Sequence, residues 1–76
     1  MRIKNTKLVK ARKEKGLTQE TLARHLNVQK STISNWENGY STPQISQAIK
    51  LASLLNEEVS ILFSSEVQDF HTKSGL

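Results

Sequence analysis

Hydrogen-bonding side chains are concentrated between Lys30 and Asn35, where five of six residues are polar or charged. Four of them, Ser31, Thr32, Ser34 and Asn35, are poor helix formers, although the segment has helical periodicity. A helical face selected only for solubility would carry Glu, Lys or Ala instead. An asparagine amide donates and accepts at once, so it can pair with a flat partner that presents both kinds of group. This segment therefore indicates a surface for recognition by hydrogen bonds.

Positive charge is concentrated at the start of the chain. The 76 residues have a net charge of +4, but residues 1–30 carry a net +7 and residues 31–76 a net −3. Such a one-sided distribution favours a polyanionic partner. The sequence contains no cysteine. Disulfides and thiolate zinc sites are therefore excluded, as expected for a protein of a reducing cytosol.

The sequence argues against an enzyme, a sensor and a membrane protein. The only histidines, His25 and His71, are far apart, and His25 is expected at the surface. There is no metal-ligand set, glycine-rich phosphate loop or nucleophile motif, so we predict no catalytic residue, metal, cofactor or small-molecule ligand. No apolar run approaches the roughly 18–20 residues that span a bilayer. The N-terminus also lacks the apolar segment of a signal peptide.

An apolar period near 3.6 residues along the chain predicts an all-α domain. Asn5 and Thr18 are expected to cap the first two helices, Gly39 to end the third, and Asn56 to end the fourth in a left-handed conformation. The expected helices cover residues 5–15, 19–26, 30–38, 43–55 (with Thr42 as cap and Pro43 in the first turn), and a short segment from Glu57 or Glu58 to residue 63.

The same period predicts the buried face of each helix. The expected inward residues are Leu8, Ala11, Arg12 and Lys15; Leu22, Ala23 and Leu26; Ile33 and Trp36, with Glu37 beside them; Ile45, Ala48, Ile49, Ala52 and Leu55, with Leu51 alongside; and Val59, Leu62 and Phe63. Residues 18–39 thus hold two short helices joined by a turn at 27–29, and the second has an apolar inner and a small polar outer face. This is the pattern of a helix-turn-helix, whose second helix fits the major groove of DNA.

Three segments carry a resemblance to a known family: KARKEKGLTQETLARHLNV, STISNWENG and TPQISQAIKLASLLN. In this order and spacing, the stretch from Lys7 to Phe63 resembles the Cro-like, or Xre, helix-turn-helix family of phage and bacterial repressors. The resemblance implies a compact five-helix lambda-repressor-like domain over residues 1–63, with the helix-turn-helix at helices 2 and 3. Residues 64–76 would be a tail that extends the last helix or aids dimerisation.

The resemblance also implies roles for single residues. Those expected to read bases are Lys30, Ser31, Thr32 and Asn35; those expected to contact the DNA backbone are Gln19, Ser34 and Asn38; and Arg12 and Glu37 would form a structural ion pair between helices 1 and 3. Independently of the resemblance, one or two of the basic residues of the first helix are expected to touch DNA, and Lys10 is assigned to the backbone from the set Lys7, Lys10, Arg12 and Lys13. The sequence departs from the family pattern at three positions. Gln29 replaces the usual Ser or Thr cap, Asn56 replaces a glycine, and Glu57 stands where an apolar residue is common.

We therefore expect a sequence-specific, double-stranded DNA-binding transcriptional regulator in the cytoplasm of a bacterium or of a phage host. It would be a repressor that binds a palindromic operator as a homodimer, since one domain reads few base pairs. Val59, Phe63, Val67 and Phe70 are the expected dimer surface. The alternative is an antitoxin-type protein-interaction module that also binds DNA. Met1 and the short tail favour a complete chain over a piece of a longer repressor.

Overall fold

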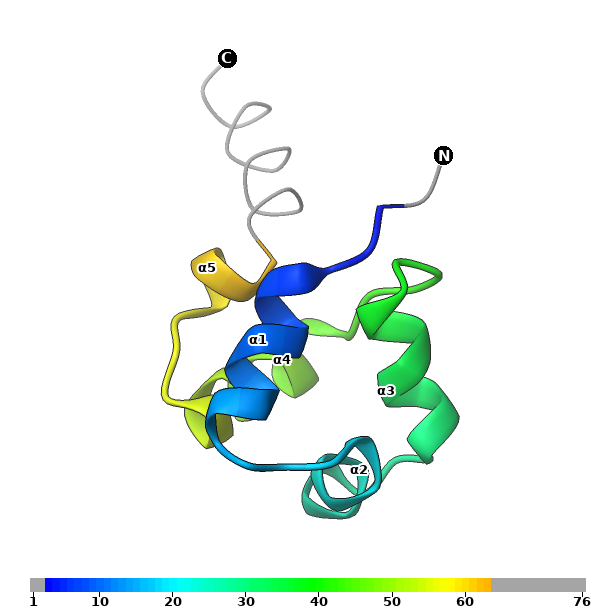
Figure 1. Cartoon of the computed structure of the whole chain (residues 1–76). Helices are drawn as coiled ribbons and strands as arrows, with labels where there is room; N and C mark the ends of the chain where they lie inside the picture. The colour runs from blue at the N-terminus through cyan, green and yellow to red at the C-terminus, as the bar shows by residue number, and fades with distance from the viewer. Residues whose placement is uncertain (1–2, 64–76) are drawn as a thin grey trace.

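The computed structural model describes residues 3–63, which fold into five α-helices (Figure 1). The helices are α1 (Thr6–Glu14), α2 (Gln19–Leu26), α3 (Lys30–Glu37), α4 (Ile45–Leu55) and α5 (Val59–Leu62). Residues 3–63 contain no strand. The prediction of an all-α, five-helix domain is confirmed.

Side-chain caps fix the starts of the first two helices. The Asn5 Oδ1 atom accepts the Leu8 N–H at 3.0 Å, and the Thr18 Oγ1 atom accepts the Thr21 N–H at 3.0 Å. Both caps were predicted, because Asn and Thr satisfy amides that have no partner within the helix. At α3, Gln29 occupies the cap position without a side-chain cap hydrogen bond. The replacement of Ser or Thr by Gln29 therefore leaves α3 without this stabilisation.

Two asparagines in the left-handed conformation end α2 and α4. Asn27 has a φ of 58° and Asn56 a φ of 55°. The short polar side chain of asparagine tolerates this conformation better than most residues do. After Asn27, the Val28 N–H donates to the Ala23 carbonyl at 3.0 Å. Because α2 ends so sharply, α3 begins only four residues after the last residue of α2.

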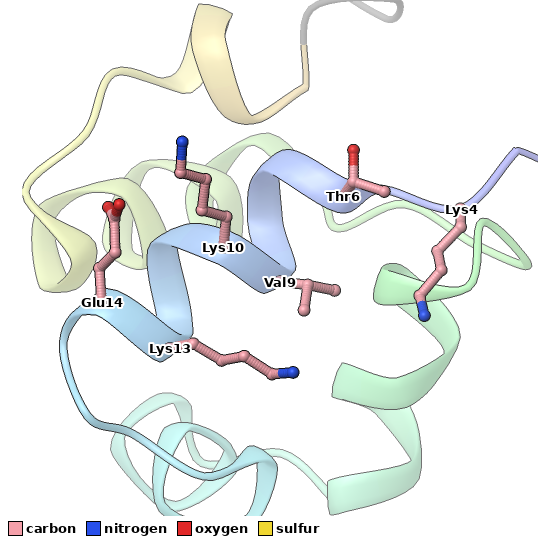
Figure 2. Close-up of a pocket in the computed structure, with 6 residues that line it drawn as sticks. All are labelled: Lys4, Thr6, Val9, Lys10, Lys13 and Glu14. Carbon is pink, nitrogen blue, oxygen red and sulfur yellow. The ribbon is translucent and has the colours of Figure 1, made fainter.

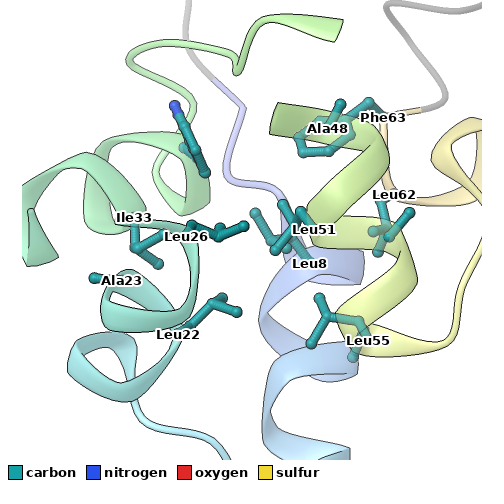
Figure 3. Packing of buried hydrophobic residues seen from close by; sticks show 13 residues of the cluster. Leu8, Leu22, Ala23, Leu26, Ile33, Ala48, Leu51, Leu55, Leu62 and Phe63 are labelled. Carbon is teal, nitrogen blue, oxygen red and sulfur yellow. The ribbon is translucent and has the colours of Figure 1, made fainter. Parts of the chain in front are cut away.

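The core receives apolar side chains from all five helices (Figure 3). Leu22 and Leu26 of α2 and Ile33 of α3 lie on one side of it, and residues of α1, α4 and α5 lie on the other. Trp36 is 4% exposed, which confirms that it is a core residue. Each large aliphatic side chain buried here contributes about 1.5–3 kcal/mol to the free energy of unfolding. The core holds α3 with its opposite, polar face outward.

The start of α4 differs from the sequence prediction. The helix begins at Ile45, so Thr42 is not its cap and Pro43 is not in its first turn. Gln44 is still extended, with a ψ of 159°, and its N–H donates to the Gln47 Oε1 atom at 3.1 Å. This side-chain contact closes the first turn two residues later than the Thr-Pro pair predicts.

The buried face of α4 is also rotated relative to the prediction. Ile45 and Ile49 are 70% and 56% exposed, whereas Ala48, Leu51, Ala52 and Leu55 are buried. Because α4 packs against α2 and α5, its buried arc extends from Leu51 at one edge to Ala52 at the other and leaves the two isoleucines outside it. Lys15, expected on the inner face of α1, is exposed as well.

A buried ion pair joins α1 to α3. The Arg12 Nε atom donates to the Glu37 Oε2 atom at 2.6 Å, and the Arg12 Nη2 atom donates to Oε1 at 3.3 Å. The Arg12 Nη1 atom donates to the Leu17 carbonyl at 2.8 Å, which ties down the loop before α2. Arg12 is 8% and Glu37 2% exposed, so both charges depend on each other for compensation.

The segment before α1 lies against the end of α3. The Asn5 N–H donates to the Glu37 carbonyl at 2.8 Å, and the Asn5 Nδ2 atom donates to the Leu62 carbonyl at 2.8 Å. Gly39 has a φ of 77°, and a Cβ atom added there would collide with the Ile3 carbonyl oxygen. Gly39 is therefore required both for its backbone conformation and for this close approach.

The two left-handed glycines offer a matched pair of substitutions. Gly16 has a φ of 70°, but a Cβ atom there would meet no described atom within 4 Å outside its chain neighbours. We expect Gly16→Ala to lower the free energy of unfolding by about 1 kcal/mol, the cost of the left-handed conformation alone. Gly39→Ala should cost about 3 kcal/mol, since the collision with Ile3 is added. Equal losses in urea denaturation would contradict the close packing of the N-terminal segment.

Removal of one partner of the buried ion pair should be costly. Glu37→Ala leaves the Arg12 guanidinium buried without a counter-charge, and we expect the free energy of unfolding to fall by about 3 kcal/mol. A double-mutant cycle with Arg12→Met and Glu37→Met isolates the pair. The double variant should lose clearly less than the sum of the single losses. Additive losses in the cycle would show that the two side chains do not interact in solution.

Candidate nucleic-acid interface

The outward face of α3 presents small polar side chains. Ile33, Trp36 and Glu37 are buried, whereas Ser31 and Asn35, one turn apart, are exposed on the opposite side. The Ser31 hydroxyl donates to the Gln29 Oε1 atom at 3.4 Å, a long contact within the same turn. The Asn35 side chain makes no hydrogen bond to any residue between 3 and 63. Its amide is therefore available to a partner as both donor and acceptor.

Other polar residues of α3 lie at the edges of this face. Thr32 and Ser34 are half-buried, and Asn38 is exposed just after the end of the helix. The Asn38 Nδ2 atom donates to the Ser34 hydroxyl at 3.3 Å, so these two side chains lie together. Their position beside the outward face suits contacts that flank those of Ser31 and Asn35.

Lys30 does not share the outward face with Ser31 and Asn35. It lines a cleft of about 630 Å³ where the end of α1 and the starts of α2 and α3 meet. Lys13 and Gln19 line the same cleft, and Glu20 adds one acidic side chain to its lining. This cleft thus combines two exposed ammonium groups with an amide donor. Such a set can hold an anion.

Gln19 is held in the cleft by the buried ion pair. Its Nε2 atom donates to the Glu37 Oε1 atom at 2.9 Å, the same oxygen that the Arg12 Nη2 atom approaches. A primary amide nitrogen carries two hydrogens, so one remains for a partner outside the fold. Gln19 is half-buried at the first position of α2. The structure therefore fixes which end of the amide points at Glu37.

The lysines of α1 and of the segment before it point in different directions (Figure 2). Lys4, Lys10 and Lys13 line a groove of about 450 Å³ along this helix. In Figure 2 the Lys13 and Lys4 side chains point toward α3, whereas Lys10 and Glu14 point the other way. Lys10 also lines a second hollow with Glu57 and Ile61, beside α5. Of the residues expected at the DNA backbone, Lys10 is thus the one that the structure does not bring near α2 and α3.

The helical period contains a signal that separates these lysines. Lys10 precedes the buried Arg12 by two residues, which places it about 160° away around the helix axis. Lys13 follows Arg12 directly and lies only about 100° away. Charge alone does not distinguish the two residues, but their angle to the buried Arg12 does.

Other functional groups are sparse in the described part of the chain. His25 is exposed, as predicted, and His71 lies outside residues 3–63. Within those residues no group of three or more His, Asp or Glu side chains could hold a metal ion. Their helices are also too short and too polar to cross a membrane.

The expected dimer surface is partly buried. Phe63 is 7% exposed and belongs to the core, and Val59 packs against the core. Phe63 therefore has little surface to offer a second copy, and its predicted place in the dimer surface is wrong. Val59 is half-buried, and its place in that surface stays a prediction. Val67 and Phe70, the other two members, lie outside the described residues.

Comparison with known proteins gives a family and two similar structures. Residues 8–62 match a family model described as helix-turn-helix. A transcriptional regulator from Listeria innocua is 31% identical with a TM-score of 0.70; the match covers 76% of this chain and 54% of that protein. The restriction-modification controller protein C.AhdI from Aeromonas hydrophila is 34% identical with a TM-score of 0.69, over 78% of this chain and 89% of that one. No curated protein compared with the chain matches it significantly.

The present chain spans about half the length of the Listeria protein but most of the Aeromonas one. The matched family consists of DNA-binding regulators and not of enzymes. The match covers both helices of the helix-turn-helix and all residues that form the cleft and the outward face of α3. The chain therefore belongs to the Xre, or lambda-repressor-like, helix-turn-helix family and is a DNA-binding transcriptional regulator.

Proposed function

We propose that this regulator is a repressor that binds a palindromic operator as a homodimer, with α3 in the major groove. The observation that carries this proposal is the outward face of α3, where Ser31 and the Asn35 amide, which has no hydrogen-bond partner among residues 3–63, are exposed opposite a fully buried face. An α-helix fits the major groove, where each base pair presents a distinct pattern of donors and acceptors. One such helix contacts few base pairs, so two copies on a two-fold site supply the required specificity. The protein would act in the cytoplasm of a bacterium or of a phage host.

Base reading is assigned to Ser31 and Asn35, with Thr32 at the edge of the same face. The Asn35 amide matches the N6 and N7 groups of adenine, which offer one donor and one acceptor. Ser34 and Asn38, which are hydrogen-bonded to each other, flank this face and are assigned to the DNA backbone.

Backbone contact is also assigned to the cleft between α1, α2 and α3. Gln19 presents its second amide hydrogen there, and Lys13 and Lys30 add positive charge. Lys30 is better suited to a phosphate than to a base, since it lies with Gln19 in the cleft and not with Ser31 and Asn35. Lys13 is better suited than Lys10, because Lys10 lies on the side of α5.

The first prediction from this proposed function concerns the salt dependence of DNA binding. The logarithm of the binding constant should fall linearly with the logarithm of salt concentration, with a slope of about −0.9 per phosphate neutralised. Lys13→Ala and Lys30→Ala should each make the slope shallower by about 1. Lys10→Ala, the matched control from the same helix, should leave the slope unchanged. A larger effect of Lys10→Ala than of Lys13→Ala would place the phosphates on the other side of α1.

The second prediction from this proposed function distinguishes residues that recognise bases from residues that contact the DNA backbone. Selection of bound duplexes from a random pool supplies the operator, and all its single-base variants are then compared. Asn35→Ala should cost about 1–3 kcal/mol at one base position and relax the preference there. Gln19→Ala should weaken binding to every sequence by a similar factor, because a phosphate carries no base identity. If Asn35→Ala weakened all sequences alike, α3 would not lie in the groove as proposed.

A further inference from the structure

The outer surface of α4 is unusual in this chain because it carries almost no charge. From Gly39 to Asn56 the only charged residue is Lys50. Ile45 and Ile49 stand one turn apart on this helix and are 70% and 56% exposed. The exposed Ser46 and Ser53 border them. On a helix, residues at this spacing share one face, so the two isoleucines form a single apolar patch.

This patch has the composition of a protein interface rather than of an ordinary surface. The centres of interfaces are depleted in charged residues and are more apolar than the rest of a protein surface. The small serines beside the isoleucines allow another backbone to approach closely. Lys50 lies about 100° further around the helix than Ile49, so its charge is at the border of the patch and not within it.

The distribution of charge over the surface also indicates which partner can bind the α4 patch. A two-fold interface places one surface against an identical copy of itself, and like charges that meet there are costly. Copies that met through α1 would oppose lysines with lysines, since that helix carries Lys7, Lys10 and Lys13 against the single acidic residue Glu14. Copies that met through the start of α5 would oppose Glu57 and Glu58 with themselves. The face of α4 with Ile45 and Ile49 can meet its own copy without such repulsion.

We propose that this face of α4 is the two-fold interface between two copies of the chain, an inference that rests on the dimeric mode of the proposed function. The position agrees with that function, because α4 starts eight residues after Glu37, at the end of the helix assigned to the groove. An interface there joins the copies close to the DNA. One helical face buries less than the roughly 800 Å² per partner of a standard interface, so free copies associate reversibly and the operator strengthens the dimer.

Single thiols test the location directly, because the sequence has no cysteine. Ile49→Cys places a thiol in the patch. Ile61→Cys is the matched control: Ile61 is 46% exposed but lies on α5 beside Lys7 and Lys10 of α1. With a short thiol-reactive crosslinker, Ile49→Cys should give a covalent dimer in several-fold higher yield than Ile61→Cys. An equal or lower yield from Ile49→Cys would overturn the proposal.

A neutral double substitution tests the contribution of the patch. Ile45→Gln with Ile49→Gln keeps the net charge and the helix, and should weaken self-association in sedimentation equilibrium by about tenfold or more. Its affinity for a single half-site should equal that of the wild type, and Ile61→Gln should change neither value. Undiminished self-association of the double variant would refute the interface. Failure of the wild type to bind any half-site would instead refute the proposed function, whatever the crosslinking result.

Discussion

One buried carboxylate organises this domain. Glu37, at the last position of α3, receives the Arg12 guanidinium from α1 and the Gln19 amide from α2. Its backbone carbonyl accepts the Asn5 N–H from the segment before α1. A buried carboxylate without partners would be strongly destabilising, so the three elements must meet around it for the fold to be stable. These contacts also set the orientation of α3, because α1, α2 and the segment before α1 all bind its last residue.

The same carboxylate connects stability to DNA binding. Its oxygens face Arg12 on the core side, and one of them also fixes the Gln19 amide at the cleft. The interaction that holds α1 against α3 therefore positions a side chain that we assign to a phosphate. Because the fold already orders the Gln19 side chain, DNA binding does not have to bear the entropic cost of ordering it.

Local features of the sequence predict much of this structure. Asn5 and Thr18 mark helix starts through their own hydrogen bonds, and Asn56 marks an end through its tolerance of the left-handed conformation. The start of α4 was missed because the Gln44–Gln47 contact closes the turn after the Thr-Pro pair. The exposure of Ile45 and Ile49 could not be predicted from their period, which shows an apolar stripe but not which edge of it the neighbouring helices cover. The Gln19–Glu37 hydrogen bond spans 18 positions, so it becomes visible only when α2 and α3 are placed together.

The two sides of α3 are almost independent. Its inward residues, Ile33, Trp36 and Glu37, hold the domain together, whereas the side chains of Ser31 and Asn35 make only one long hydrogen bond with the rest of the described chain. Exchange of the outward pair therefore costs the fold little. In proteins that descend from one ancestral gene, a few substitutions on the outward face of such a helix can therefore change the operator that is recognised. No stabilising substitution has to come first, because the fold loses little stability. A regulator built in this way can acquire a new target while its scaffold stays unchanged.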